Sequence, residues 1–241
     1  MDYSNGKMDA QQNENKWNKN PFLLRVMGMG KPYFVKTPWW LKRIYPAYQW
    51  SVDTNEKIIY LTFDDGPHPV ATPFVLDELK KYKAKATFFC IGKNVLAEPE
   101  IYKRIIDEGH AVGNHTHNHF NGWKTKDDVY MADVSEAGKF IDSILFRPPY
   151  GRITSFQAKN IKAALKKTTA TIIMWDVISG DFDESLTGQQ CLQNVILNAG
   201  KGSIIVLHDS QKAFPRLEFF LPVALNFFEK KGYRFEKLKS F

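Results

Sequence analysis

Residues 58–67 read Ile-Ile-Tyr-Leu-Thr-Phe-Asp-Asp-Gly-Pro, an apolar run followed by two aspartates and a break in the chain. The run predicts a buried strand, and Gly66 with Pro67 predicts a sharp turn at its end. Neighbouring side chains on a strand point to opposite faces, but a turn at the strand end can direct both Asp64 and Asp65 toward one site. Two carboxylates in one site repel each other unless a cation or a proton lies between them. The pair therefore favours a functional site over a simple Asp-Gly-Pro turn.

Further ligands for a cation are present in residues 113–119, which read Gly-Asn-His-Thr-His-Asn-His. His115 and His119 are four residues apart, a spacing that places two imidazoles on one face of a helical turn. Together with one carboxylate they form a three-ligand site with open positions, which is the pattern of catalytic metal centres. His117 faces away in that helical spacing, so we expect it not to bind the metal.

From residue 58 onward, strand-like and helical patterns alternate. Strands are expected at 58–64, 86–92, 110–114, 145–148, 170–178, 203–208 and 233–238, and helices at about 71–82, 97–108, 126–143, 154–167, 187–199 and 215–231. This alternation predicts an α/β fold with a parallel sheet and right-handed crossovers. Seven units without a long linker favour closure into a barrel, and a doubly wound open sheet is the alternative.

Polar clusters lie at or near the ends of these predicted strands. The clusters are Asp64-Asp65, the histidines of 115–119, Arg147-Pro148-Pro149-Tyr150-Gly151, Trp175-Asp176 and Leu207-His208-Asp209. In barrels and in open parallel sheets, active sites form at the carboxyl ends of the strands. We therefore expect the five clusters to meet at one edge of the sheet.

Four of these stretches, in this order, resemble the motifs of the polysaccharide deacetylase (NodB-homology) family, which is of the carbohydrate esterase family four type. They are Thr-Phe-Asp-Asp-Gly-Pro at 62–67, His-Thr-His-Asn-His at 115–119, Arg-Pro-Pro-Tyr-Gly at 147–151 and Leu-His-Asp at 207–209. The resemblance covers about residues 58–238. It implies a distorted (β/α)7 barrel whose active site removes N- or O-acetyl groups from sugars with the help of a divalent metal.

The resemblance also implies how individual residues act. Asp64 is the catalytic base that takes a proton from the attacking water, and Arg147 holds this carboxylate ionised and fixes its direction. His208 is the general acid that protonates the leaving amine. A backbone N–H near Tyr150 is a second donor to the oxyanion of the tetrahedral intermediate.

A metal and a set of substrate contacts complete the implied site. One divalent ion, most often zinc, with cobalt, nickel or manganese as alternatives, is held by Asp65, His115 and His119. Such an ion polarises the amide carbonyl and lowers the pKa of a bound water. The residues expected to contact the substrate are Tyr150, Trp175, Phe182 and Leu207, of which Leu207 lines the acetyl pocket.

One stretch departs from the family pattern. After the fifth strand the family has Asp-x-x-Asp-Trp, and the first aspartate of this pattern is expected to support the general-acid histidine. Aligning Asp181 and Phe182 with the closing Asp-Trp places Ile178 at the position of that first aspartate. An apolar side chain cannot stabilise an imidazolium. We therefore expect Asp176, on the same strand face, to support His208, with Asp181 as a second candidate.

The sequence thus predicts a metal-dependent hydrolase that acts on carbon–nitrogen bonds. Its expected reaction is removal of N-acetyl groups from a sugar polymer such as peptidoglycan, a chitin-like chain or another envelope glycan. Two kinds of alternative remain open. One is an O-acetyl esterase or another amide hydrolase on the same scaffold, and the other is a catalytically weak glycan-binding protein.

Three segments are expected along the chain. Residues 1–30 are polar and lack the apolar core of a signal peptide, which predicts a disordered extension or a tag. Residues 31–57 are rich in aromatic side chains and are expected to pack on the barrel, and residues 58–241 form the catalytic domain. These features predict a cytoplasmic protein, or an envelope or periplasmic one if the native N-terminus differs.

The formal net charge of +7 comes from basic residues that are spread along predicted helix faces. This distribution predicts a solvated surface and no nucleic-acid partner. No apolar run reaches the length of a membrane span. Cys90 and Cys191 are expected to be buried thiols. We expect a monomer whose partner is an N-acetylated glycan.

Overall fold

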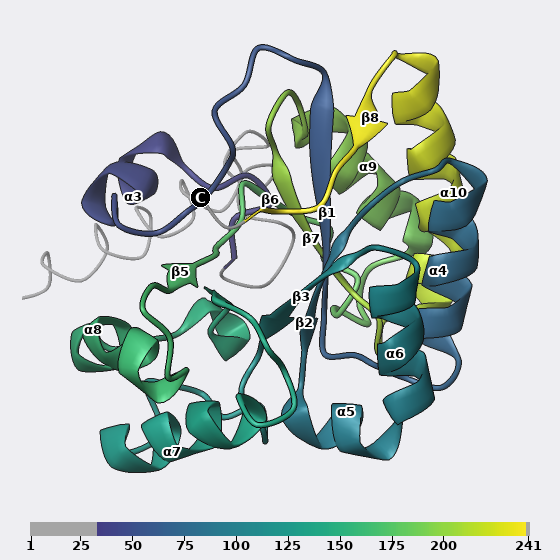
Figure 1. Cartoon of the computed structure of the whole chain (residues 1–241). Coiled ribbons are helices and arrows are strands. Elements are labelled where there is room, and N and C mark those ends of the chain that lie inside the picture. Colours follow the sequence, from purple (N-terminus) through teal and green to yellow (C-terminus); the bar gives the residue numbers. More distant parts are fainter. Residues whose placement is uncertain (1–32, 240–241) are drawn as a thin grey trace, which may run out of the picture.

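The structure is a computed structural model that describes residues 33–239 (Figure 1). One curled parallel sheet runs in the order β5-β4-β3-β2-β1-β7-β6, and β8 pairs with β1. Helices pack against this sheet, which confirms the predicted α/β class and the distorted (β/α)7 barrel. The extension predicted at residues 1–30 lies outside the described residues and stays a prediction.

The elements alternate along the chain as the periodicity predicts. The strands are β1 (Ile58–Asp64), β2 (Thr87–Cys90), β3 (Ala111–Asn114), β4 (Leu145–Phe146), β5 (Thr171–Ile172), β6 (Val177–Ile178), β7 (Ile204–His208) and β8 (Arg234–Phe235). The helices are α3 (Trp39–Ile44), α4 (Ala71–Lys81), α5 (Gly92–Ala97), α6 (Pro99–Asp107), α7 (Asp127–Ala137), α8 (Ser155–Ala164), α9 (Gly188–Asn198) and α10 (Phe214–Lys230), with a short 3₁₀ helix at Pro149–Gly151. The strand expected over residues 170–178 is instead two short strands, β5 and β6.

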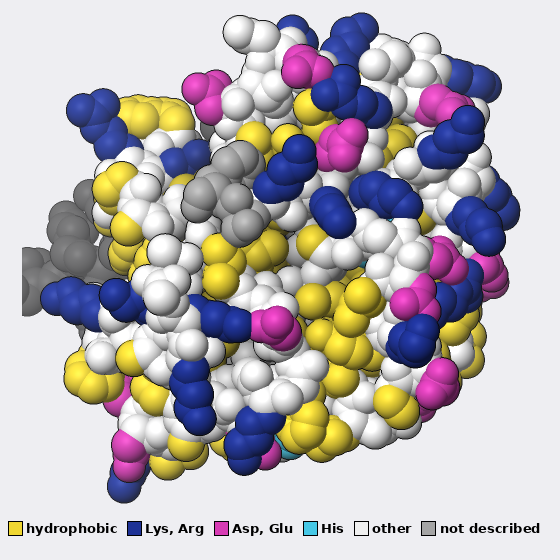
Figure 2. Space-filling model, in the orientation of Figure 1, with side chains coloured by type: hydrophobic (Ala, Val, Ile, Leu, Met, Phe, Trp, Pro, Cys, Tyr) yellow, Lys and Arg dark blue, Asp and Glu magenta, His cyan; other side chains and the backbone are white. Residues whose placement is uncertain are grey.

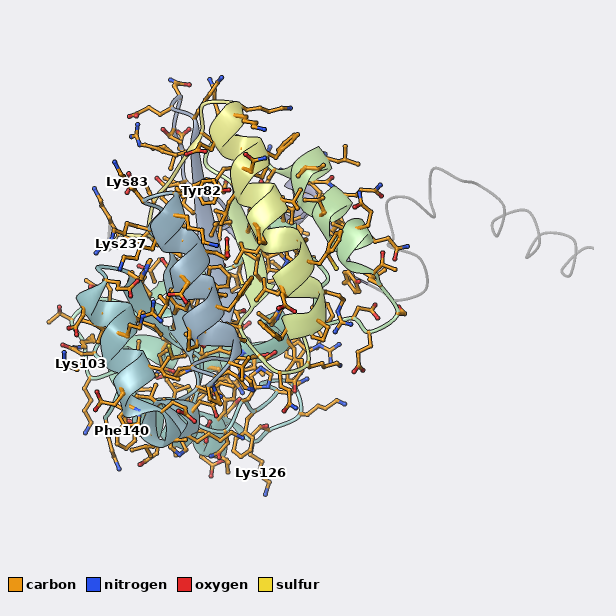
Figure 3. The ribbon with its side chains drawn as sticks, turned by 90° about the vertical axis from the view of Figure 1, so that its right-hand side faces the viewer. Tyr82, Lys83, Lys103, Lys126, Phe140 and Lys237 are labelled. Carbon is orange, nitrogen blue, oxygen red and sulfur yellow. The ribbon has the colours of Figure 1, made fainter. Side chains whose placement is uncertain are left out.

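Strand β1 separates two apolar layers because its residues alternate between the faces of the sheet. On the outer face, Phe63 packs with Leu76 of α4 and Leu221 of α10. Figure 3 shows α4, α6 and α10 side by side over this face. On the inner face, Tyr60 and Ile204 pack inside the curl. Asp64 and His208 continue this inner face to the carboxyl ends of β1 and β7, where they are neighbours in register.

The sheet is not closed by its own strands, since β5 and β6 are its two ends. Residues 35–49 fill the opening. Gln49 pairs with Ile173 next to β5, and Lys36 pairs with Val177 of β6. Backbone hydrogen bonds from Met174 N–H to Gln49 O (2.8 Å) and from Ile178 N–H to Val35 O (2.9 Å) link this segment to both ends. We call residues 35–49, together with the segments next to β5 and β6 that they contact, the seam.

The surface charges, the cysteines and the helix lengths agree with the predictions made from composition. Figure 2 shows lysine and arginine side chains mixed with aspartate and glutamate on the visible face, without one large basic patch. Cys90 and Cys191 are buried free thiols, as predicted. Within residues 33–239, none of the helices has the length and apolar character needed to cross a membrane.

Candidate active site

Asp64 and Asp65 reach one site because the backbone turns sharply at Asp65. The φ of Asp65 is 78°, in the left-handed region that costs a residue with a Cβ roughly 1–2 kcal/mol. The Asp209 carboxylate holds this turn, because it accepts the Gly66 N–H (3.1 Å) and the Thr72 hydroxyl (2.5 Å). A Cβ atom on Gly66 would lie 2.1 Å from Asp209 Oδ2, so the close approach of the carboxylate requires glycine.

Three predicted metal ligands converge at the carboxyl ends of β1 and β3. Asp65 Oδ1 lies 3.6 Å from His115 Nε2 and 3.1 Å from His119 Nε2. The ligand atoms of the three residues are all within 4.8 Å of one another. His115 Nδ1 lies 2.7 Å from the carbonyl oxygen of Arg147. The carbonyl can only accept, so Nδ1–H donates to it and Nε2 is left as the ligand atom.

The charges of this triad suit a divalent cation. Burial lowers the pKa of His115 to about 4, so its imidazole is neutral at pH 7 and able to ligate. Burial by itself raises the pKa of Asp65, but the close approach of His119 (3.1 Å) and the charges of His208 and His115 outweigh burial and lower this pKa. Asp65 Oδ1 is a buried oxygen without a hydrogen-bond partner in the described chain. An ionised, unpartnered oxygen facing two ring nitrogens is a donor set that zinc-type ions prefer.

The histidines converge through a loop and not through the helical turn that we expected. The segment follows β3 without helical structure, and both Thr116 (φ 65°) and His119 (φ 60°) have left-handed backbone conformations. Asp133 holds this loop by accepting the N–H groups of His117 and Asn118, each at 2.9 Å. The His117 ring lies 6.1 Å from the Phe140 ring, outside the triad.

Arg147 is buried beneath the site, and every nitrogen of its guanidinium has a partner. Nη1 donates to Asp64 Oδ1 and to Thr62 Oγ1, each at 2.7 Å. Nε and Nη2 donate to the carbonyl oxygens of Ile173 (3.2 Å) and Met174 (3.0 Å). This set of bonds fixes the guanidinium, and the guanidinium in turn fixes the direction of the Asp64 carboxylate.

His208 ends β7 beside Asp64, and Asp181 fixes its orientation. His208 Nδ1 lies 2.7 Å from Asp181 Oδ1, and the His208 backbone N–H donates to Asp181 Oδ2 at 2.9 Å. Burial lowers the pKa of the imidazole, but the negative charge of Asp181 and its hydrogen bond outweigh burial and raise this pKa to about 9. At neutral pH the ring is therefore protonated and able to donate a proton from Nε2.

A buried carboxylate, a protonated histidine and a candidate metal triad at one sheet edge form the constellation that the four motifs imply. A family model for polysaccharide deacetylases matches residues 51–172. The chain belongs to the polysaccharide deacetylase family.

Named relatives of this deacetylase act on glycans. A peptidoglycan-N-acetylglucosamine deacetylase of Bacillus cereus is 39% identical over 192 residues, which are 77% of this chain and 88% of the relative. A chitooligosaccharide deacetylase of Azorhizobium caulinodans is 36% identical over 66% of this chain and 76% of its own length. A crystal structure of a peptidoglycan N-acetylglucosamine deacetylase with a bound N-oxidanyl-benzamide covers 84% of this chain and 95% of its own, with a TM-score of 0.71 and 32% identity.

The prediction that Asp176 supports His208 is wrong for this deacetylase. The Asp176 carboxylate is bound at the seam by Lys36 (2.5 Å), Lys42 (2.5 Å) and the Ser203 hydroxyl (2.6 Å). Asp176 precedes β6 and therefore lies at the amino end of that strand, away from the edge that holds His208. The carboxylate that bonds to His208 is Asp181, the second candidate. The apolar side chain of Ile178 therefore does not leave His208 without a carboxylate partner.

Three of the four residues predicted to contact the substrate are aromatic, and their role in substrate binding stays a prediction. The Tyr150 ring lies 4.7 Å from the His119 ring, and the Phe182 ring lies 5.3 Å from the His208 ring. Trp175 packs beneath the loop of Tyr150, where a Cβ on Gly151 would lie 2.6 Å from the indole. These rings form apolar walls beside the polar groups.

Leu207 does not line the acetyl pocket, and this part of the prediction is wrong. Its side chain is buried on the outer face, in the layer that contains Leu221 of α10. Because side chains alternate along β7, Val206 shares the inner face with His208 and lies in register with Thr62. The sequence does carry this signal, since positions two residues apart on a strand share a face.

Two residues near the site were missed by sequence reasoning. Asp209 was noted only as the end of its motif, yet it is the group that holds Gly66, and burial together with Asp65 and Asp64 raises its pKa to about 8. Tyr33 lies 5.2 Å from the Phe182 ring and donates its hydroxyl to Asp183 (3.2 Å). No local pattern places Tyr33 there, because the contact joins segments 150 residues apart.

Proposed function

We propose that this chain is a metal-dependent deacetylase that removes N-acetyl groups from an N-acetylated glycan. One observation carries the proposal. The Asp65 Oδ1 atom, which has no hydrogen-bond partner in the described chain, faces two histidine ring nitrogens, and Asp64 and a protonated His208 flank it on adjacent strands. The names of the relatives, which are peptidoglycan and chitooligosaccharide deacetylases, support the same substrate class.

Asp65, His115 and His119 would hold the metal, and zinc is the ion that best suits two nitrogens and one carboxylate oxygen. When bound, such an ion acts as a Lewis acid toward the acetyl carbonyl and makes water more acidic. The Arg147 carbonyl that accepts the His115 Nδ1–H fixes the ring for this role.

Asp64 acts as the base. Its Oδ1 accepts the Arg147 Nη1–H, which leaves Oδ2 to take the proton from the water that attacks the acetyl carbon. The hydrogen bond from the guanidinium stops the carboxylate from rotating, so the accepting oxygen is positioned before the substrate binds. The Tyr150 backbone N–H is the proposed donor to the oxyanion that forms.

His208 acts as the general acid. Asp181 holds Nδ1, so Nε2–H is the proton available to the departing sugar amine. Transfer of this proton completes cleavage of the C–N bond and leaves acetate and the free amine as products. Phe182 against the imidazole excludes water from one side of the ring.

The proposal is tested by release of acetate from a panel of acetylated glycans, measured beside the metal content of the protein. Zinc-loaded protein should release acetate from N-acetylglucosamine oligomers or from peptidoglycan, and Asp64→Asn should abolish this release while zinc stays bound. Acetate from O-acetylated xylan alone would show an O-acetyl esterase. Glycan binding with a full complement of zinc and no acetate from any substrate would show a binding protein.

A further inference from the structure

A tryptophan outside the predicted site projects from the surface next to it. The Trp123 side chain is 65% exposed, although its Nε1–H donates to the Ile153 carbonyl oxygen at 3.1 Å. The one polar atom of the indole is therefore satisfied within the protein, and the apolar ring faces solvent. Large apolar side chains held in this way are typical of surfaces that bind a ligand.

The loop that carries Trp123 is tightly held. The Trp123 N–H donates to Asn121 Oδ1 at 3.1 Å, and the carbonyl oxygen of Gly122 accepts from the buried side chain of Gln157 at 2.9 Å. A Cβ on Gly122 would lie 2.4 Å from the Arg152 carbonyl oxygen, so the two loops are in direct backbone contact. A ring that is already oriented loses little conformational entropy when a ligand binds to it.

Arg152 supplies a positive charge at the same place. Its guanidinium lies 5.3 Å from the centre of the Trp123 ring. In the described part of the chain, Arg104, Arg147 and Arg234 pair with carboxylates, whereas Arg152, like Arg43 and Arg216, pairs with none. Its donors are therefore available to an anionic ligand, and a planar guanidinium binds a carboxylate through two parallel hydrogen bonds.

This surface continues from the metal triad. Arg152 follows Tyr150 by two residues, which limits the distance between their Cα atoms to about 7 Å. The Tyr150 side chain is 60% exposed and its ring lies 4.7 Å from the His119 ring. Tyr150, which contacts the metal ligand His119, and Arg152, which lies over Trp123, are thus close in the same chain segment.

We propose that Trp123 and Arg152 form a subsite for the sugar that neighbours the residue being deacetylated. The indole stacks on the apolar face of that pyranose ring, and the guanidinium pairs with a carboxylate that the same sugar carries. The inference rests on the proposed function and narrows its substrate to an N-acetylated glycan that bears carboxylates. Peptidoglycan has this chemistry, because its N-acetylmuramic acid residues carry lactyl groups, whereas chitin-like chains are neutral.

Two matched glycans distinguish stacking on Trp123 from carboxylate pairing with Arg152. They are a peptide-free peptidoglycan tetrasaccharide with lactyl carboxylates and the neutral tetramer of N-acetylglucosamine. Trp123→Ala should lower kcat/KM for both glycans by roughly tenfold through KM, because stacking does not involve the reacting atoms. Arg152→Gln should lower kcat/KM roughly tenfold for the peptidoglycan tetrasaccharide alone, and added salt should shrink that difference.

Control variants are available on α3, which lies apart from the site (Figure 1). Trp39 is 73% exposed, and Arg43 is an exposed arginine, so Trp39→Ala and Arg43→Gln remove the same chemistry elsewhere. Neither control should change kcat/KM for either glycan. Unchanged kinetics in Trp123→Ala would overturn the subsite, and an equal loss on both glycans in Arg152→Gln would overturn carboxylate recognition.

Measurements of glycan binding distinguish a failure of the subsite from a failure of the proposed function. In the zinc-loaded Asp64→Asn background, calorimetric Kd values for the two glycans should show the same pattern of losses in the two subsite variants. If the parent chain releases no acetate yet Trp123→Ala weakens binding, the deacetylase proposal fails and the subsite holds. If acetate is released normally and Kd is unaffected by either variant, the subsite fails and the deacetylase proposal holds.

Discussion

The carboxyl edge of the sheet that carries the candidate active site, which we call the catalytic edge, and the seam each contain an aspartate with a buried carboxylate oxygen, but the two carboxylates differ in their hydrogen-bond partners. At the seam, both oxygens of Asp176 are bound, by Lys36, Lys42 and Ser203. At the catalytic edge, Asp65 Oδ1 has no hydrogen-bond partner in the described chain although it is buried. Buried polar atoms are normally satisfied, so the full set of partners indicates a structural role for Asp176, whereas the missing partner of Asp65 Oδ1, beside two histidine ring nitrogens, fits a ligand site.

Strained backbone conformations are likewise concentrated at the catalytic edge. Among residues 33–239, six non-glycine residues have a positive φ, and Asp65, Thr116, His119 and Tyr150 lie at the catalytic edge. The other two are Lys83 and Lys166, which follow the ends of α4 and α8, where a left-handed residue is common. Strain of this kind persists where the surrounding structure holds it, and it is concentrated here around the ligands that must converge.

The largest effect should come from the metal ligands. His119→Ala should lose bound zinc and reduce deacetylation to background, because the triad would keep only two ligand atoms. His117→Ala should retain most zinc and most activity, since His117 packs against Phe140 outside the triad. The measurements are metal content by mass spectrometry and acetate release. Equal zinc loss from the two variants would show that the triad is assigned to the wrong histidines.

The next effect compares the two aspartates directly. Asp181→Asn should lower kcat about 10²-fold, because His208 loses the charge that keeps it protonated and oriented. Asp176→Asn should leave kcat unchanged, since Asp176 contacts only groups at the seam. Zinc content should be the same in both variants. A large loss of kcat in Asp176→Asn would mean that the seam controls the catalytic edge.

The pH profile of kcat tests the pairing of His208 with Asp181. A general acid must be protonated, so the alkaline limb of kcat in the parent protein should lie near the His208 pKa of about 9. Without the Asp181 charge, burial is opposed only by the more weakly acting Asp65 and Asp64, so the limb in Asp181→Asn should move to lower pH, toward the ordinary histidine value of about 6.5. A folded pKa above the unfolded one also stabilises the fold below about pH 6.5, and this contribution is lost as the pH rises through 9. An unchanged limb in Asp181→Asn would exclude His208 as the acid.

A smaller effect, on stability alone, should come from the seam. Replacing both Lys36 and Lys42 with methionine leaves the Asp176 carboxylate buried without a cation. The expected loss is about 2 kcal/mol, below the roughly 3–5 kcal/mol of a fully buried pair, because the two lysines are partly exposed and screened. Denaturant unfolding measures it, and adding Asp176→Asn should restore part of the loss by removing the charge. A double variant as stable as the parent would show that the seam does not depend on these ion pairs.

Residue type and strand order by themselves determined much of this protein. The alternation of strands and helices predicted the parallel sheet, and the motif positions predicted which residues meet at its carboxyl edge. Local spacing indicated His115 and His119 as ligands, and the family resemblance added Asp65, because ligand chemistry depends on residue identity. Arg147 beside Asp64 followed from the motifs, and the structure joins the two at 2.7 Å.

Tertiary structure decided what local spacing cannot reach. Gly180, with a φ of 81°, turns the chain after β6 so that Asp181 and not Asp176 meets His208. Asp209 bonds to Gly66, and residues 35–49 pair with the segments beside β5 and β6. Both contacts join segments more than 100 residues apart. Such contacts form only when the sheet brings distant strands together, so they depend on the fold as a whole.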